Sequence, residues 1–225
     1  MSSSTHVGRL GGVAAILGVA VLLAATFLHP MNAPPGDAAA AFAEYAADQY
    51  WVATHLGQLL GAVLITGGLI ALTGTLSADR ARAWGTLGAA AAIANLSLAG
   101  ALQAVDGIAL KVMVDRWAAA APEARPLALE GAFAVRQIEI GLASISIVFF
   151  GLTALLYATA LLNDGRSRWP GWLGIVAGIG TVAAGVVQAH TGFSDLAMAA
   201  TMPSNLLLLL WLVAVGVLML RRGRG

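Results

Sequence analysis

Residues 10–28 read LGGVAAILGVAVLLAATFL, a run of 19 residues without a charged side chain. The hydrocarbon core of a bilayer is about 30 Å thick, and an α-helix crosses it with roughly 20 residues. No water in that core can satisfy the backbone, so an apolar stretch of this length crosses as a helix. The stretch therefore predicts a transmembrane helix that ends before His29 and Pro30.

Five further stretches are long and apolar enough to do the same. They cover residues 51–76, 84–110, 133–162, 170–190 and 203–220. The composition agrees, because 59% of the 225 residues are hydrophobic and only 10% are charged, against about 25% charged in soluble domains. We therefore predict an all-α, polytopic transmembrane bundle of six spans that forms a single integral membrane domain over residues 1–225.

Basic residues are shared unevenly between the two ends of these spans. One end carries Arg9, Arg80, Arg82, Arg166, Arg168, Arg221, Arg222 and Arg224, and the other carries Lys111, Arg116, Arg125 and Arg136. Lysine and arginine gather on the cytoplasmic side of membrane proteins. We therefore predict a multi-pass protein of the bacterial cytoplasmic (inner) membrane with both termini in the cytoplasm. The first apolar run exceeds the 7–15 residues of a signal peptide, so we expect an anchor that is not cleaved.

Several classes of function are excluded by what the sequence lacks. It contains no cysteine, which rules out disulfides, thiolate metal sites and thiol catalysis. The net charge of +1 offers no basic surface for nucleic acid. No HExxH, GxSxG or phosphate-binding glycine motif is present. The expected partners are the lipid bilayer, a small-molecule or lipid ligand, and a membrane protein packed through small-residue faces.

Short segments repeat along the chain. Gly8-Arg9-Leu10-Gly11 aligns with Gly171-Trp172-Leu173-Gly174, and Gly85-Thr86-Leu87-Gly88 fits the same pattern. Gly68-Leu69-Ile70-Ala71-Leu72 aligns with Gly151-Leu152-Thr153-Ala154-Leu155. The pattern predicts three helical hairpins of related origin.

The two longer connections, Pro30 to Tyr50 and Val112 to Ala132, lie at the end opposite the termini. Asp37 is placed to cap a helix over Ala38 to Asp48 with Phe42 and Tyr45 on one side, and Tyr50 and Trp51 would follow at the headgroup level. Asp115 to Ala132 contains Pro122 and Pro126, and predicts a second short surface helix.

Ionisable side chains within spans are costly and commonly functional. Counting 1.5 Å of rise per residue places five of them near the outer boundary of the hydrocarbon: His55, Asp106, Arg136, Glu139 and His190. Three pairs with i, i+3 spacing share a helix face: His55 with Gln58, Gln103 with Asp106, and Arg136 with Glu139. Asn95 lies three turns inward of Asp106 on nearly the same face, so a polar stripe is predicted to run into the membrane.

Several roles fit these residues, and the sequence identifies neither substrate nor cofactor. In a binding or transport-related module, which we favour slightly, Arg136 holds an anionic group and Asp106 or Glu139 a cationic one, in a pocket open to the extracytoplasmic side. In a metal-dependent membrane enzyme, His55, His190, Asp106 and Glu139 supply metal ligands and a general base. In a haem b protein, His55 and His190 are the axial ligands. Two further interpretations require no ligand at these residues. Either the protein is an accessory subunit of a larger complex, or the groups pair structurally with one another and with headgroups.

One junction resembles a known family. The segment Arg166-Ser167-Arg168-Trp169-Pro170-Gly171-Trp172-Leu173-Gly174, with Leu155-Leu156-Tyr157 before it, is similar to the DUF4386-like family of bacterial membrane proteins, whose function is not established. The resemblance implies a six-span layout and brings no catalytic residues with it.

Overall fold

The computed structural model describes residues 3–34, 36–165 and 168–222, so Arg166, Ser167 and Arg224 lie outside the described residues. The described residues form helices and no strand. The elements in order are α1 (Ser3–Leu28), α2 (Ala38–Ala47), α3 (Trp51–Thr73), α4 (Asp79–Gln103), the π-helical segment η1 (Ala104–Leu110), α5 (Lys111–Ala118), α6 (Arg125–Asp164), α7 (Trp169–Thr191) and α8 (Asp195–Arg222).

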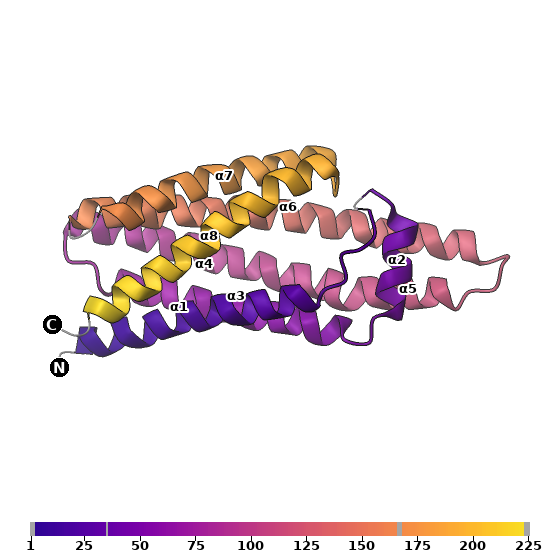
Figure 1. The fold of residues 1–225 in the computed structure, drawn as a ribbon, viewed down its shortest axis with the longest axis horizontal. Coiled ribbons are helices and arrows are strands. Elements are labelled where there is room, and N and C mark those ends of the chain that lie inside the picture. The colour runs from indigo at the N-terminus through magenta and orange to yellow at the C-terminus, as the bar shows by residue number, and fades with distance from the viewer. Residues whose placement is uncertain (1–2, 35, 166–167, 223–225) are drawn as a thin grey trace.

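Six helical runs in the described chain are long and apolar enough to cross a membrane, namely α1, α3, the continuous run α4–η1–α5, α6, α7 and α8. The prediction of an all-α bundle with six spans is confirmed, and the fold fits an integral membrane protein. Both termini lie at one end of the bundle, which we call the terminal end (Figure 1). The opposite end carries α2 and the outer turns of α5 and α6, and we call it the capped end.

Helix α8 runs diagonally across the bundle (Figure 1). Near the terminal end it packs on α1, where a Cβ built on Gly216 would lie 3.0 Å from the carbonyl oxygen of Gly12. Towards the capped end it packs on α7, where a Cβ built on Gly180 would lie 3.3 Å from Ser204 Oγ. Helix α8 therefore leaves α1 as it approaches the capped end.

The aligned repeats make equivalent helix contacts. Gly68 of α3 meets Ala15 of α1, because a Cβ built on Gly68 would lie 2.8 Å from the Cβ of Ala15. The alignment places Gly151 of α6 and Gly178 of α7 at the same two positions, and a Cβ built on Gly151 would lie 2.8 Å from the carbonyl oxygen of Gly178.

The same correspondence holds seven residues closer to the capped end on each of the four helices. A Cβ on Gly61 would lie 2.9 Å from the nitrogen of Leu22, and one on Gly185 would lie 3.0 Å from the carbonyl oxygen of Ser144. Small residues at this spacing let two helices pack closely along one seam. The pair α1 and α3 thus resembles the pair α7 and α6 in packing as well as in sequence. A common origin for three hairpins stays a prediction.

The predicted connection from Val112 to Ala132, with its own surface helix, is wrong. The runs Asp79–Ala118 and Arg125–Asp164 contain 40 residues each, about 60 Å of helix, or twice the hydrocarbon thickness. Pro126 falls in the first turn of α6, where a missing N–H costs nothing, so it starts the helix and does not interrupt it. Both helices therefore project beyond the membrane at the capped end.

Helix α2 forms as predicted and lies across this projection. The Asp37 carboxylate accepts a hydrogen bond from the nitrogen of Ala40 at 3.0 Å, and Phe42 and Tyr45 are buried beneath the helix. Lys111 Nζ donates to the carbonyl oxygen of Tyr45 at 2.9 Å. A cation at the C-terminus of a helix also complements its dipole, so α2 is fixed at both ends.

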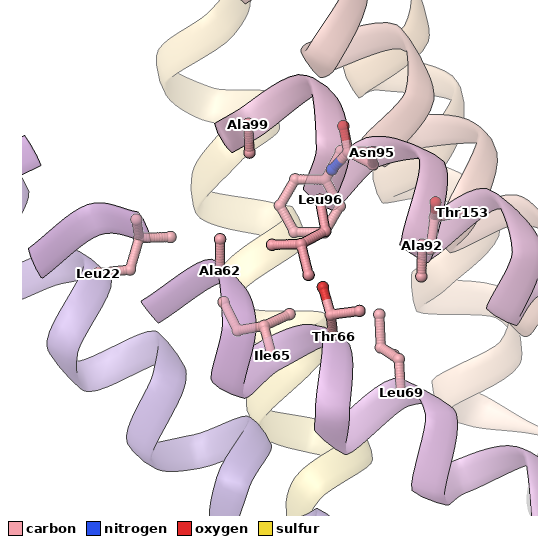
Figure 2. Close-up of a pocket in the computed structure, with 11 residues that line it drawn as sticks. Leu22, Ala62, Ile65, Thr66, Leu69, Ala92, Asn95, Leu96, Ala99 and Thr153 are labelled. Carbon is pink, nitrogen blue, oxygen red and sulfur yellow. The ribbon is translucent and has the colours of Figure 1, made fainter. Parts of the chain in front are cut away.

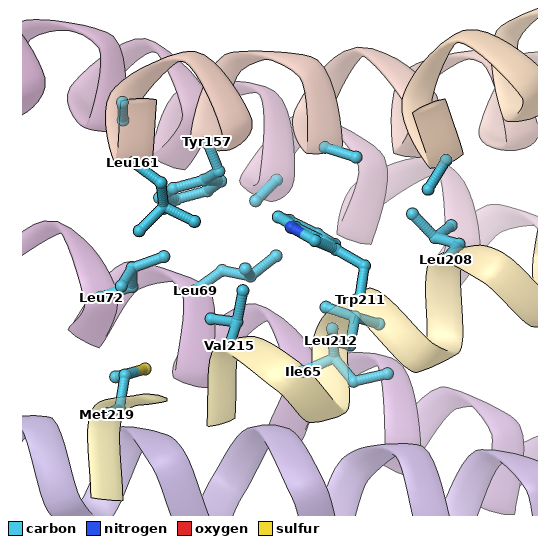
Figure 3. Packing of buried hydrophobic residues seen from close by; sticks show 14 of the residues in the cluster. Ile65, Leu69, Leu72, Tyr157, Leu161, Leu208, Trp211, Leu212, Val215 and Met219 are labelled. Atoms are coloured by element: carbon cyan, nitrogen blue, oxygen red, sulfur yellow. The ribbon is translucent and has the colours of Figure 1, made fainter. Parts of the chain in front are cut away.

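An apolar cluster fills the bundle on the terminal side (Figure 3). Its fully buried side chains include Leu69, Leu72, Tyr157, Leu161, Trp211, Leu212, Val215 and Met219. At the terminal end, Asp164 accepts hydrogen bonds from Ser77 N at 2.8 Å and Ser77 Oγ at 3.0 Å, which joins the α3–α4 connection to the end of α6.

The glycine contacts predict a specific stability effect. We expect Gly151→Ala to lower the thermal unfolding midpoint in detergent and to destabilise the protein by about 1–3 kcal/mol, because its methyl group would overlap backbone atoms of α7. Gly141→Ala on the same helix is the matched control, since a Cβ there meets nothing within 4 Å. Equal midpoints for the two variants would contradict the close α6–α7 contact.

Candidate functional site

His55 lies one turn into α3 and is 1% exposed, with an oxygen atom against each ring nitrogen. Its Nδ1 lies 2.7 Å from the carbonyl oxygen of Trp51, and its Nε2 lies 3.0 Å from Asp106 Oδ2. A carbonyl oxygen can only accept, so Nδ1 carries a proton and donates it to Trp51. In the neutral ring, Nε2 then presents a lone pair to a carboxylate.

Two lone pairs at 3.0 Å repel unless something positive lies between them. A second proton, carried by His55 or by Asp106, or a metal cation meets this requirement. The hydrogen bond from Nδ1 to a backbone carbonyl is the arrangement that orients histidine ligands of metals.

Asp106 reaches His55 because the helix that carries it is locally widened and lacks a side chain at the contact. Asp106 lies in the π-helical segment η1, a distortion often found at functional sites. The next residue is Gly107, where a Cβ would lie 2.5 Å from the Cβ of His55. Trp51 Nε1 donates to the backbone oxygen of Asp106 at 3.1 Å. Trp51 is buried and Tyr50 is exposed, and their place at the headgroup level stays a prediction.

His29, which follows the last residue of α1, completes the cluster. Its ring centroid lies 5.2 Å from that of His55 and 4.8 Å from that of Trp51, and its Nδ1 lies 2.8 Å from the carbonyl oxygen of Pro30. One potential ligand atom each from His29, His55 and Asp106 all lie within 4.8 Å of one another. Burial lowers the pKa of His29, opposed by the charge of Asp106, which favours the neutral ring that binds metals.

The sequence reasoning missed His29 because it treated the residue only as the end of the first span. The available signal was its position, since a histidine directly after an outgoing span lies at the same level as a histidine one turn into the returning span. Equal depth on consecutive spans would have paired His29 with His55.

Tyr45 of α2 covers this cluster from the outside. Its ring lies 4.2 Å from that of Trp51 and 6.0 Å from that of His29. Burial raises the pKa of Tyr45 to about 12, against an opposing effect of the positive charge of Arg136. The phenol therefore stays neutral at physiological pH and can donate a hydrogen bond.

A cavity of about 300 Å³, the outer pocket, adjoins the cluster. Its walls include His29, Pro30, Met31, Glu44, Tyr45, Gln58, Asp106, Arg136, Glu139, Phe193 and Met198. The Arg136 guanidinium lies 5.5 Å from the ring centre of Phe42 and 5.4 Å from that of Phe193. Glu139 is 5% exposed, and its Oε2 has no hydrogen-bond partner within the described chain. The pocket thus presents both signs of charge beside the histidines.

A second cavity of about 350 Å³, the inner chamber, lies below the outer pocket. Gln58 lines both cavities, and Gln103 Nε2 donates to Gln58 Oε1 at 3.2 Å. The remaining walls are mostly apolar and include Leu22, Leu23, Leu59, Ala62, Ala99, Leu102, Ile147, Phe150, Leu208 and Leu209, with Asn95, Ser146 and Asn205 among them. Three buried wall atoms lack a hydrogen-bond partner in the part of the chain described: Gln103 Oε1, Ser146 Oγ and Asn95 Oδ1.

The cavities end at a small void of about 40 Å³ that shares Asn95 and Phe150 with the inner chamber. In Figure 2, Asn95 lies over this void, with Thr66 and Leu69 of α3 opposite. Beyond it stands the apolar cluster of the terminal half. Asp106 of the predicted polar stripe therefore lines the outer pocket, and Gln103 and Asn95 line the inner chamber.

His190 does not join the site. It is exposed on α7, which packs against α6 and α8, and it is not one of the three clustered ligand residues. Gln188 is buried and its Nε2 donates to Ser144 Oγ at 3.4 Å, away from the cluster. His55 and His190 were predicted at the same depth, but they lie on different sides of the bundle. The arrangement therefore does not support the two as paired haem ligands, nor His190 as a metal ligand.

No family model, curated protein or solved structure matches the chain. The resemblance to the DUF4386-like family stays a prediction. The case for a function rests on the geometry of the cluster and its two cavities.

The contact between η1 and α3 predicts a local requirement for glycine. We expect Gly107→Ala to destabilise the protein by about 1–3 kcal/mol, because the added methyl group would occupy the place of the His55 side chain. Gly100→Ala, on α4 and facing open space, should leave the thermal unfolding midpoint almost unchanged. A Gly107→Ala protein as stable as the Gly100→Ala protein would show that His55 and η1 are not packed in this way.

Proposed function

We propose that this protein is a membrane metalloprotein in which His29, His55 and Asp106 hold a divalent transition metal ion such as Zn²⁺. The metal ion faces the outer pocket, where Arg136 receives a small ligand that carries an anionic group. The observation that carries the proposal is the placement of His55 Nε2 directly against Asp106 Oδ2, with His29 close by.

The ligand chemistry supports a metal ion in preference to a shared proton. Two imidazole nitrogens and a carboxylate are a common ligand set of catalytic zinc sites, which leave a further position open. Ligand atoms on a tetrahedral ion at about 2.0–2.2 Å are about 3.4 Å apart, close to the 3.0 Å between His55 and Asp106. Both histidines also have Nδ1 against a backbone carbonyl oxygen, which orients Nε2 for coordination.

The outer pocket supports a role beyond holding the ion. Arg136 and the metal ion would together attract a phosphate or carboxylate group. The binding role follows from this pairing of charge with an open coordination position.

A second candidate function is hydrolysis of the bound ligand. Glu139 favours it, because its carboxylate lines the outer pocket and its Oε2 has no partner among the described residues. A metal ion of this type lowers the pKa of bound water to about 7, and a neighbouring carboxylate can take the released proton.

The basic residues support an orientation for the site. Arg9, Arg80, Arg82, Arg168 and Arg221 lie at the terminal end, which we place in the cytoplasm of a bacterium. The capped end and the outer pocket would then face the extracytoplasmic side of the inner membrane.

Metal analysis tests the ligand set. Purified wild-type protein should bind one Zn²⁺, and His29→Ala, His55→Ala and Asp106→Ala should each weaken binding by at least about 100-fold, since each removes a direct ligand. His190→Ala is the matched control and should bind as the wild type does. Unchanged affinity in the three ligand variants, with all four proteins folded, would overturn the proposal.

Cysteine labelling tests the orientation, and the absence of native cysteine makes single-cysteine variants unambiguous. In intact cells, a membrane-impermeant maleimide should label Ala119→Cys at the capped end and leave Arg80→Cys unlabelled until the cells are opened. Both positions are exposed in the structure, so access depends on the side of the membrane alone. The reverse pattern would place the outer pocket in the cytoplasm.

A further inference from the structure

We infer that the ligand of this site is a single-chain membrane lipid with an anionic headgroup, whose hydrocarbon chain occupies the inner chamber. The headgroup part of this inference rests on the proposed metal site, and the chain part rests on the inner chamber alone.

The two cavities form one continuous binding space. Gln58 lines both of them, and its hydrogen bond with Gln103 lies at their junction. Ionisable groups surround the outer part, namely His29, Glu44, Asp106, Arg136 and Glu139. The inner part is lined mostly by leucine, alanine, isoleucine and phenylalanine. A ligand that fills both parts has a charged end and an apolar end.

The inner chamber lies at the depth of the lipid chains, and α1 and α8 both contribute to its walls. Helix α8 contacts α1 at Gly216 and then turns towards α7, and the chamber walls come from both α1 and α8 in the half where they separate (Figure 1). Asn205 of α8 lines the chamber and is itself exposed. At Asn205 the chamber wall is therefore exposed on the outside of the bundle, and a lipid that enters there need not cross the capped end.

The polar atoms on the wall define the neck of the lipid. Gln103 Oε1 is a buried acceptor with no donor among the described residues, and it lies between the charged pocket and the apolar chamber. A hydroxyl group next to the headgroup would donate to it. Ser146 Oγ and Asn95 Oδ1 lie deeper, where a buried water beside the chain can serve them.

The opposite end of the chamber suits a chain terminus. From Gln103 to Asn95 the chamber follows eight residues of helix, or about 12 Å. Below Asn95 the chamber adjoins the small void, whose walls include Ile65, Leu69 and Ala92 of the apolar cluster in Figure 3. A chain of this length would end here, against the apolar cluster.

The test compares one headgroup with and without a chain. Zn²⁺-loaded protein in a non-ionic detergent is titrated with 1-decanoyl lysophosphatidate, which carries a phosphate, a neck hydroxyl and a chain, and with glycerol 3-phosphate, which lacks the chain. Wild-type protein should bind the lysolipid at least about 100-fold more tightly, because only the lysolipid buries apolar surface in the chamber.

Two variants locate the chain. Ala99→Phe fills the inner chamber and should bring the lysolipid to within about threefold of glycerol 3-phosphate, while Zn²⁺ binding and glycerol 3-phosphate affinity stay as in the wild type. Ala101→Phe places the same ring on the exposed side of α4 and should keep the full preference. An equal preference in both variants, or no preference in the wild type, would overturn the inference.

The remaining outcomes separate this inference from the proposed function. Normal Zn²⁺ binding with neither phosphate compound bound would overturn the lipid assignment and leave the metal site standing. Lysolipid binding that depends on Ala99, in protein that binds no Zn²⁺, would support the chamber assignment and overturn the metal site.

Discussion

The site depends on one constraint, the position of His55 between two oxygen acceptors inside a membrane protein. The carbonyl oxygen of Trp51 accepts a hydrogen bond from Nδ1, and Asp106 Oδ2 lies 3.0 Å from Nε2. In water, solvation would weaken this repulsion. The His55 side chain is only 1% exposed, so water cannot screen the contact. A proton or a metal cation between the two atoms would resolve the conflict, and the proposed metal ion would take the nearby imidazole of His29 as a third ligand.

Close contacts between neighbouring helices maintain this arrangement. Seams of small residues hold α1 against α3 and α6 against α7, which leaves room between the pairs for the two cavities. Gly107 lets η1 lie against His55, and α2 covers the cluster with Tyr45. The apolar cluster lies on the terminal side of the two cavities and meets the inner chamber at Leu208. The proposed binding space and this apolar core therefore adjoin within one bundle.

The sequence was informative wherever periodic or local chemistry decides the structure. Hydropathy gives six spans because lipid leaves the backbone no alternative to a helix, and Asp37 marks the start of α2 because its carboxylate caps that helix. The i, i+3 spacing put His55 and Gln58 on one face, and the structure sets them opposite Asp106 and Gln103. Depth alone could not tell which helices are neighbours, so His190 was grouped with His55 and His29 was missed. The π-helical segment depends on tertiary packing, for which a single sequence carries little signal. The early start of α6 was missed although a proline in the first turn, Pro126, is a local signal for a helix start.

The most direct measurement is an anomalous diffraction map, recorded at the zinc absorption edge, from crystals of the protein grown with Zn²⁺. A metal site predicts one strong peak about 2.0–2.2 Å from His29 Nε2, His55 Nε2 and a carboxylate oxygen of Asp106. A map without a peak at this position, in crystals where His55 and Asp106 remain 3.0 Å apart, would show that a proton fills the place assigned to the metal ion.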